Sequence, residues 1–401
     1  MPLSYADSVC DCFSQVGGST TLFAKSSDRP ATEPQLVVAV GARQASAICR
    51  TQYLEIPGCP AEAAILAQPT WLWGAEHGVN ASGVAIGNEK VYTASAADPE
   101  RPGLIGMDLV RLGLERSRTA DEAMEVMVDL LERWGQSGIA DAHHAEAYHS
   151  SFLIVDPHGG WTLETSGATW AARRVAANHA QSNRISLADD WERGSSDLEP
   201  GCDLDVLRDP TRPTDSADGR LAATTAAVAG GRLTPAEAMA VLRDHGRGPW
   251  GAVGGEAHPA PAAVDAAGRG ATVCMHRFRD LATTSSMVCV LGDQGIQRLW
   301  MAPGAPCVAP FLPAAIVDGV PVVPDILGAL DAWSAMARWR VAAEGDDDLL
   351  ERIRGLVGPL EAELLGRSLE LGPDLGAWRA LCEDASRQAA EVVARVPVPA
   401  G

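Results

Sequence analysis

Alternating polar and apolar residues near the N-terminus predict a β-hairpin. Residues 10–16 alternate roughly in polarity, a diglycine follows at 17–18, and residues 20–25 form a second β-prone run. If the diglycine is a two-residue loop, counting back along both strands sets Cys10 opposite Lys25. Directly opposed residues have Cβ atoms roughly 5 Å apart. The hairpin therefore places an ammonium group beside a thiol.

That pairing has a chemical interpretation and a purely structural one. An ammonium group beside Cys10 favours the thiolate, which is the nucleophilic form of the side chain. Asp28 lies just past the strand end, where a carboxylate could orient an amine. Cleavage after Val9 would free the α-amine of Cys10, which titrates near about 7.7–8.0 and can serve as a base. The alternative is a buried hairpin in which Cys10 and Cys12 are inert.

The segments after the hairpin continue the β pattern. Residues 35–40 and 48–56 are predicted strands, 78–83 a turn and 84–86 a buried strand. Asn88 then stands at a strand terminus, where its amide could donate to an oxyanion or cap its own turn.

The rest of the chain alternates between sheet and helix. Asn183, after an antiparallel meander, is either a second amide donor or a turn residue. Residues 190–222 are predicted to cross the surface irregularly, and 245–270 to form a loop that could cover the site. Predicted strands are 151–156, 160–165, 170–175, 272–276 and 285–291, and predicted helices are 106–117, 119–134, 234–244, 348–365 and 378–393.

Composition narrows the class of protein. The 401 residues have a formal charge of −20, which argues against nucleic acid and anionic membrane surfaces as partners. Nine cysteines are scattered without a CxxC pair, which favours a reducing cytoplasm over a disulfide framework. No apolar window is long enough to span a membrane. A soluble cytoplasmic protein is expected.

A run of histidines in 141–149 invites a metal interpretation. It contains His143, His144 and His149, but without HExxH-like spacing. Adjacent histidines do not share one face of a strand or helix, so a polar loop is the prediction. Neither a metal nor a cofactor is expected.

Longer motifs carry a resemblance to a known family. The runs 69–89, 106–136 and 148–172 closely resemble the secernin and cysteine dipeptidase family, and the likeness extends over roughly 10–315. Shorter matches are Cys10-Asp11, 27–30, 243–244, 274–276 and 283–287. The resemblance implies an α+β N-terminal-nucleophile hydrolase: an αββα sandwich of two antiparallel sheets between helical layers, with a C-terminal helical extension. The implied divisions are a removable leader (1–9), a hydrolase domain (10–315) and a C-terminal helical region (316–401).

The resemblance also implies roles for individual residues. Cys10 matches the nucleophile, Lys25 a basic position usually occupied by Arg in amidase relatives, and Asp28 the carboxylate near the α-amine. Asn88 and Asn183 match two asparagines associated with oxyanion stabilisation or amine orientation.

The function implied is a cysteine-dependent amide hydrolase that acts on dipeptides or small N-acyl amides through a thioester. Trp71 and Trp73 are candidates for the substrate pocket, although buried core is the expected role of at least one. A homo-oligomer is compatible with the sequence. Two alternatives remain open: an acyltransferase that uses the same thioester, and a non-catalytic secernin-like protein whose N-terminus stays blocked.

Overall fold

The computed structural model describes most of the chain. The described residues are 10–212, 214–246, 271–276, 280–293, 295–344 and 346–398. The predicted leader, 1–9, and nearly all of the predicted loop 245–270 lie outside them.

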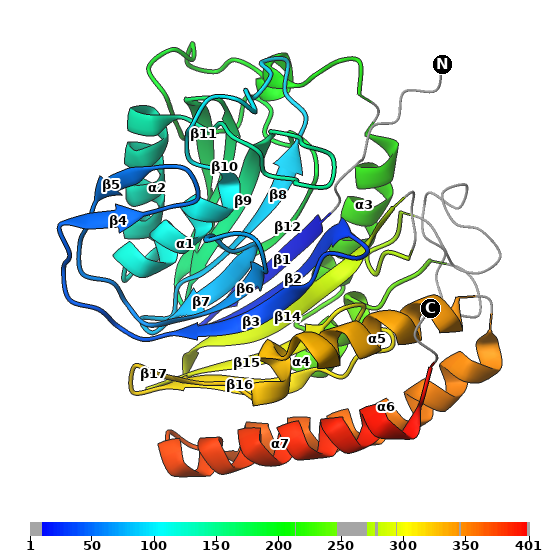
Figure 1. The fold of residues 1–401 in the computed structure, drawn as a ribbon. Coiled ribbons are helices and arrows are strands. Elements are labelled where there is room, and N and C mark those ends of the chain that lie inside the picture. The colour runs from blue at the N-terminus through cyan, green and yellow to red at the C-terminus, as the bar shows by residue number, and fades with distance from the viewer. Residues whose placement is uncertain are drawn as a thin grey trace.

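Two large antiparallel sheets pack face to face (Figure 1). In spatial order, the seven-stranded sheet contains β12 (Asn178–Ser182), β1 (Cys10–Gly17), β2 (Thr20–Pro30), β14 (Leu281–Asp293), β15 (Ile296–Pro303), β16 (Leu312–Val317) and β17 (Val320–Val322). The eight-stranded sheet contains β13 (Arg193–Gly194), β11 (Thr169–Val175), β10 (Gly159–Ser166), β9 (His149–Asp156), β8 (Ala85–Val91), β7 (His77–Asn80), β6 (Ala64–Pro69) and β3 (Gln35–Val40).

Helices cover the outer face of each sheet. The eight-stranded sheet is covered by α1 (Gly106–Arg116) and α2 (Ala120–Trp134). On the seven-stranded sheet lie α3 (Asp215–Ala229), α4 (Pro235–Val241), α6 (Asp347–Glu370) and α7 (Leu375–Arg395), with α5 (Leu330–Ala343) packed beside α6 and α7. The four-layer αββα sandwich predicted from the sequence is therefore confirmed (Figure 1). Among the described residues, no helix is both long and apolar enough to cross a membrane.

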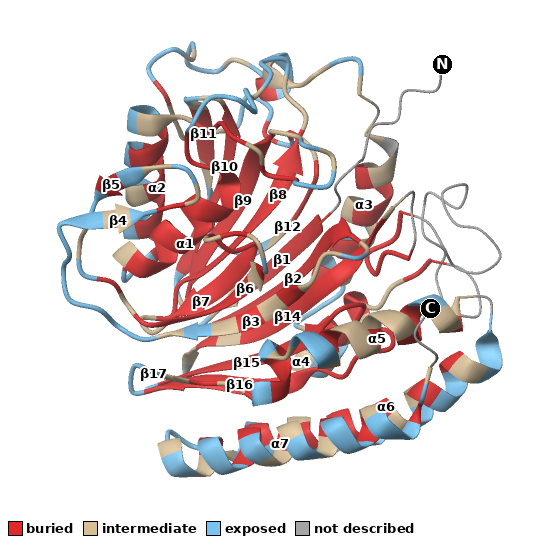
Figure 2. Ribbon diagram, viewed as in Figure 1, coloured by how far each residue is buried: buried red, intermediate tan, exposed pale blue. Residues whose placement is uncertain are grey.

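The layering buries the central strands on both faces (Figure 2). Every residue of β8 and β9 is buried, although β8 contains Asn88, Glu89 and Lys90. Strands covered on both sides are normally apolar throughout, so buried charges between the sheets require partners. Because side chains alternate along a strand, Glu89 points between the sheets toward Lys25, whereas Asn88 points to the opposite face, against Met107 of α1.

The C-terminal helices share a hydrophobic core with the seven-stranded sheet. Leu360 and Leu364 of α6 and Trp378 of α7 belong to the same buried cluster as Trp300 of β15 and Leu312 of β16. Strand β16 itself spans residue 315. The helices therefore form the outer layer of the sandwich.

The N-terminal hairpin exists, but its predicted register was wrong. Gly17 pairs with Thr20, so the two-residue loop is Gly18-Ser19, and Gly18 has a φ of +65°. Cys10 lies opposite Ser27, not Lys25. Glycine adopts positive φ without steric cost, which favours Gly18 inside the loop. A two-residue shift keeps each side chain on its predicted face.

Two strand predictions had the wrong extent. The strand predicted at 48–56 is a small hairpin of β4 (Ile48–Arg50) and β5 (Glu55–Pro57), closed by backbone hydrogen bonding between Thr51 and Leu54. The strand predicted at 84–86 runs on to Val91, and the preceding turn is shorter because 77–80 forms β7. Pairing with β9 along its whole length extends β8.

Two irregular regions also differ from prediction. The segment 190–222, expected to be irregular, contains the start of α3, which an alanine-rich run continues to Ala229. The segment 272–276 is not a ladder strand. There the Thr272 hydroxyl donates to the Cys274 carbonyl at 2.8 Å, and such local side-chain bonding competes with sheet pairing.

Candidate active site

Cys10 is the first residue of β1 and lies between β12 and β2 in the seven-stranded sheet. Its side chain is buried, with 4% of the residue exposed. The backbone N–H of Cys10 donates to Oδ1 of Asn183, and the backbone N–H of Asp28 is hydrogen-bonded to the Cys10 thiol. The nitrogen and the sulfur of Cys10 thus have separate polar partners.

Lys25 lies opposite Cys12, which puts it diagonally across from Cys10 on the same face. Its Nζ is 3.7 Å from Oε1 of Glu89 on β8, and both side chains are fully buried. Gly87 permits this approach, because a Cβ there would stand 2.5 Å from Lys25 Cδ and 2.7 Å from Cys12 Sγ. Burial lowers the pKa of Lys25, but the negative charges that Cys10 and Cys12 carry when ionised, together with the Glu89 carboxylate, raise it above the ordinary value. Lys25 therefore remains an ammonium group.

The thiol of Cys10 is protonated in the uncleaved chain. Burial raises its pKa to about 12, although Lys25 and the backbone N–H of Asp28 lower it. A buried thiol of this kind needs a base to become a nucleophile. A free α-amine on Cys10 itself would be such a base.

Asp28 is a buried acid close to Cys10 and Arg220. Its Oδ1 accepts a hydrogen bond from the Thr283 hydroxyl at 2.5 Å, whereas Oδ2 has no hydrogen-bond partner within the described ranges. Burial raises the pKa of Asp28 to about 8, although Arg220 and Thr283 lower it. A carboxylate with one unsatisfied oxygen beside Cys10 is suited to holding an ammonium group.

Asn183 follows β12, and both ends of its amide are engaged. Oδ1 accepts from the Cys10 N–H and from Arg220 Nη2 at 3.0 Å, while Nδ2 donates to the Lys90 carbonyl at 3.0 Å. The Lys90 contact joins the two sheets. The geometry supports amine orientation for Asn183 more directly than oxyanion stabilisation.

Arg220 is a residue that the sequence analysis missed. It is fully buried on α3, and its Nη1 donates to Oδ2 of Asp11 at 2.6 Å and to the Cys10 carbonyl at 3.1 Å. It holds the backbone of Cys10 and the acceptor oxygen of Asn183 together. The only sequence signal was an isolated arginine in an alanine-rich run, which does not indicate burial.

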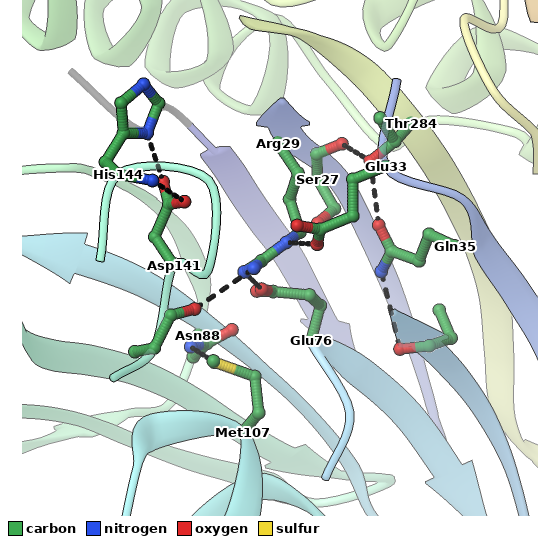
Figure 3. Close-up of polar contacts among 12 residues, drawn as sticks. Ser27, Arg29, Glu33, Gln35, Glu76, Asn88, Met107, Asp141, His144 and Thr284 are labelled. Carbon is green, nitrogen blue, oxygen red and sulfur yellow. Dashed lines mark hydrogen bonds and ion pairs between the residues drawn. The ribbon is translucent and has the colours of Figure 1, made fainter. Parts of the chain in front are cut away.

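Asn88 lies within β8, not at the strand terminus predicted for it. With its amide nitrogen turned toward Glu76, it donates to Oε2 at 2.6 Å and to the Glu76 carbonyl at 2.9 Å; the opposite orientation faces Met107 Sδ at 3.5 Å (Figure 3). Glu76 is fixed by Arg29, whose Nη1 donates to its Oε1 at 2.5 Å. Asn88 therefore belongs to an inter-sheet polar chain near Cys10.

The two predicted pocket tryptophans lie apart. Trp71 packs on the small cluster of Leu72 and Met107, next to the Arg29 network. Trp73 instead stacks on Arg111, 4.4 Å from the guanidinium carbon, and lines a cavity of about 280 Å³. None of Cys10, Lys25, Asp28, Asn88 or Asn183 lines that cavity.

The structure thus brings Cys10, Lys25, Asp28 and Asn183 together, with Asn88 in the facing sheet and Trp73 outside the group. The αββα sandwich is the fold of N-terminal-nucleophile hydrolases, and here a buried cysteine is the first residue of one of its strands.

The comparison with protein families is more specific. The model for Peptidase family C69 matches residues 19–193. The match confirms the resemblance to secernin and dipeptidase-like hydrolases over these residues. The match ends at β13, so Cys10 and Arg220 lie outside it. Family and site together support a cysteine-dependent amide hydrolase.

The similarity to solved structures is low. Penicillin V acylase from Agrobacterium tumefaciens is 13% identical, with a TM-score of 0.42, over 78% of this chain and 88% of that one. A variant of conjugated bile acid hydrolase from Clostridium perfringens is 9% identical, with a TM-score of 0.42, over 72% and 88%. The fold assignment rests on the layers and strand order described above.

Proposed function

We propose that this protein is an amide hydrolase of dipeptides or small N-acyl amides, with Cys10 as nucleophile and its freed α-amine as base. The observation that carries the proposal is the environment of the Cys10 nitrogen. Instead of continuing a strand ladder, this nitrogen donates to the Asn183 side chain, beside the unsatisfied Oδ2 of Asp28. A buried acceptor set of this kind suits an ammonium group better than a peptide N–H.

The proposed reaction has two steps. The α-amine takes the proton of the Cys10 thiol, and the sulfur attacks the substrate carbonyl to give a tetrahedral intermediate. Collapse breaks the C–N bond, the α-ammonium protonates the leaving amine, and a thioester remains. Water, deprotonated by the same amine, then attacks the thioester carbonyl, which releases the acid and restores the thiol.

Lys25 has an electrostatic role in this scheme. Its ammonium group lowers the pKa of the Cys10 thiol against the effect of burial, so less free energy is needed to form the thiolate. Asp28 and Asn183 would orient the α-amine, and Arg220 would hold Asn183 in place. Trp71, packed next to the Arg29 network, is the better placed of the two tryptophans to meet a substrate.

The proposed dipeptide preference rests on the resemblance to cysteine dipeptidases, and the match to a peptidase family supports peptide bonds as the target; N-acyl amides are the broader class. A reducing cytoplasm remains the proposed compartment, since all nine cysteines are free thiols.

The test begins with the intact mass and N-terminal peptide map of the purified wild type and of Cys10→Ala. The wild type is expected to lose residues 1–9, and Cys10→Ala to keep them if cleavage is autocatalytic. The mature protein is then assayed on dipeptides and N-acyl amides, with a competing amine to detect acyl transfer. A folded wild type that retains its leader and turns over none of these substrates would contradict the proposal.

A further inference from the structure

A second group of buried polar side chains lies apart from Cys10 and has no part in the proposed reaction. It contains His245, Cys274, His276 and Cys307, and all four residues are buried. One ligand atom from each lies within 4.8 Å of those of the other three. Nε2 of His276 is 3.0 Å from Cys307 Sγ and 3.6 Å from Cys274 Sγ. Four soft or borderline donors thus converge on one point in the interior.

This donor set fits a tetrahedral metal ion. Zinc binds thiolate sulfur at about 2.3 Å and imidazole nitrogen at about 2.0–2.1 Å, so ligand atoms in a tetrahedral site are about 3.3–3.8 Å apart. The separations of 3.0 and 3.6 Å around His276 are close to that range. Two thiolates also neutralise a divalent cation, which removes the cost of burying its charge.

The surroundings of His276 resemble those of a metal-bound imidazole. While Nε2 faces the two sulfurs, Nδ1 is 3.5 Å from Oε1 of Glu344, and Arg340 holds that oxygen at 2.5 Å. A carboxylate behind a ligating histidine fixes the tautomer that leaves the other nitrogen available for the metal.

We propose that His245, Cys274, His276 and Cys307 form a closed, four-ligand site for one structural zinc ion. Because the protein supplies all four ligands and buries them, no coordination position is left for substrate, which distinguishes a structural site from a catalytic one. The sequence analysis considered a metal only for the histidines of 141–149 and expected none. The four residues of the proposed site come from three separate segments, and no pair of them has CxxC spacing.

The position of the site indicates what the ion would stabilise. Segment 271–276 carries two ligands and forms no strand ladder. Its Met275 N–H donates to the Thr283 hydroxyl at 2.8 Å, and that hydroxyl donates to Asp28 Oδ1. A metal that fixes Cys274 and His276 would therefore also fix Asp28.

The experiment uses the full-length wild type without a histidine tag, purified under reducing conditions and dialysed, with metals measured by plasma mass spectrometry. About one zinc per chain is expected. The double variant Cys274→Ser/Cys307→Ser should lose it. Cys289→Ser, which removes a buried thiol outside the cluster, is the matched control and should keep it.

Because the double variant could fail to fold, a second measurement uses the wild type alone. Exchange of the bound metal for Co²⁺ should produce thiolate-to-cobalt charge-transfer absorption and the intense visible bands of tetrahedral cobalt. Folded wild type that binds neither zinc nor cobalt stoichiometrically would overturn the proposal. Isolation of a native Cys274–Cys307 disulfide would do the same. Neither readout depends on hydrolase activity, so this site and the proposed function can fail independently.

Discussion

Cys10 and Cys12 lie two residues apart on β1, on the same face, and both are buried, yet their surroundings differ. Burial raises the pKa of the Cys10 thiol to about 12, although Lys25 and the backbone N–H of Asp28 act in the opposite direction. The thiol of Cys12 is hydrogen-bonded to the Glu89 carboxylate, and burial together with Glu89 raises its pKa well above the ordinary value. Lys25 lowers the pKa of both thiols, so the ammonium group alone does not distinguish them.

The backbone hydrogen bonding of Cys10 and Cys12 also differs. Cys10 is at the start of the strand, and its nitrogen donates to a side chain, whereas Cys12 is paired with Gln181 on one side and Lys25 on the other. Only Cys10 can gain a free α-amine without dismantling the sheet. Strand position, more than thiol chemistry, therefore favours Cys10 over Cys12 as the proposed nucleophile.

The largest expected effect is that of Cys10→Ala. Turnover should fall by roughly 10⁴-fold or more, because the variant lacks the sulfur that forms the proposed thioester. The intact mass should retain residues 1–9 if the chain cleaves itself. Substantial activity in this variant would rule out Cys10 as the nucleophile.

Asn183→Ala should have the next largest effect. The variant removes the acceptor of the Cys10 N–H and leaves Arg220 without one partner. We expect leader removal and kcat to fall by about 10²–10³-fold, comparable with loss of one preorganised hydrogen bond at a reaction centre. Asn80→Ala, which removes a buried asparagine bonded to helix α1, is a control that should lower stability and leave kcat largely unchanged.

Lys25→Met tests the electrostatic contribution. Without the ammonium group, the pKa of Cys10 rises further and kcat/KM should fall by about tenfold or more, with the pH–rate profile displaced to higher pH. Glu89 would be left as an unpaired buried charge, so the free energy of unfolding should drop by about 3–5 kcal/mol. Lys25→Arg keeps the positive charge, so its kcat/KM should fall less. An unshifted pH–rate profile in Lys25→Met would contradict the electrostatic role of Lys25.

The raised pKa of Asp28 predicts that the stability of the uncleaved chain depends on pH. Its folded pKa of about 8 exceeds the ordinary value of 3.8, so between these pH values the folded state holds a proton that the unfolded state has lost. The free energy of unfolding should therefore fall as pH rises from 3.8 to about 8, by up to about 1.4 kcal/mol per pH unit. Urea unfolding of Cys10→Ala measures this decline, and adding Asp28→Asn should flatten it. Equal slopes in the two proteins would show that Asp28 is ionised in the fold.

Cys12→Ala should have the smallest effect. It removes a thiol with no proposed role, so leader removal should proceed and kcat should stay within about threefold of the wild type. The vacated volume should cost about 1–2 kcal/mol of unfolding free energy, measured by urea titration. A loss of activity comparable with that of Cys10→Ala would remove the distinction between the thiols.

Part of this site could be predicted from the sequence, because strand periodicity determines which side chains of the hairpin share a face. A hairpin with period two keeps Cys10, Lys25 and Ser27 on one face even when the register is two residues off. The hairpin also placed Asp28 just past the strand end, where a carboxylate could orient an amine. Local reasoning left Asn183 as either an amide donor or a turn residue, and the family resemblance placed it in the same site as Cys10.

The missed residues depend on contacts between distant segments. Arg220 reaches Cys10 because α3 packs on β1 and β12, and no pattern within α3 reveals this contact. The His245–Cys307 cluster likewise draws on segments that only the folded sheet brings together. Local periodicity predicts which face a residue occupies, but not which distant side chain shares that face.

The hydrogen bonds around Cys10 also bear on the order of events during synthesis. Cys10 emerges from the ribosome early, but Asn183, Arg220 and the Thr283 partner of Asp28 are made much later. The Trp333 indole, later still, donates to the Thr284 carbonyl at 3.0 Å, where the pairing of β14 with β2 is irregular. In a nascent chain, Cys10 is therefore present long before the side chains that surround it in the folded protein. Any self-cleavage that needs those side chains must await nearly complete translation.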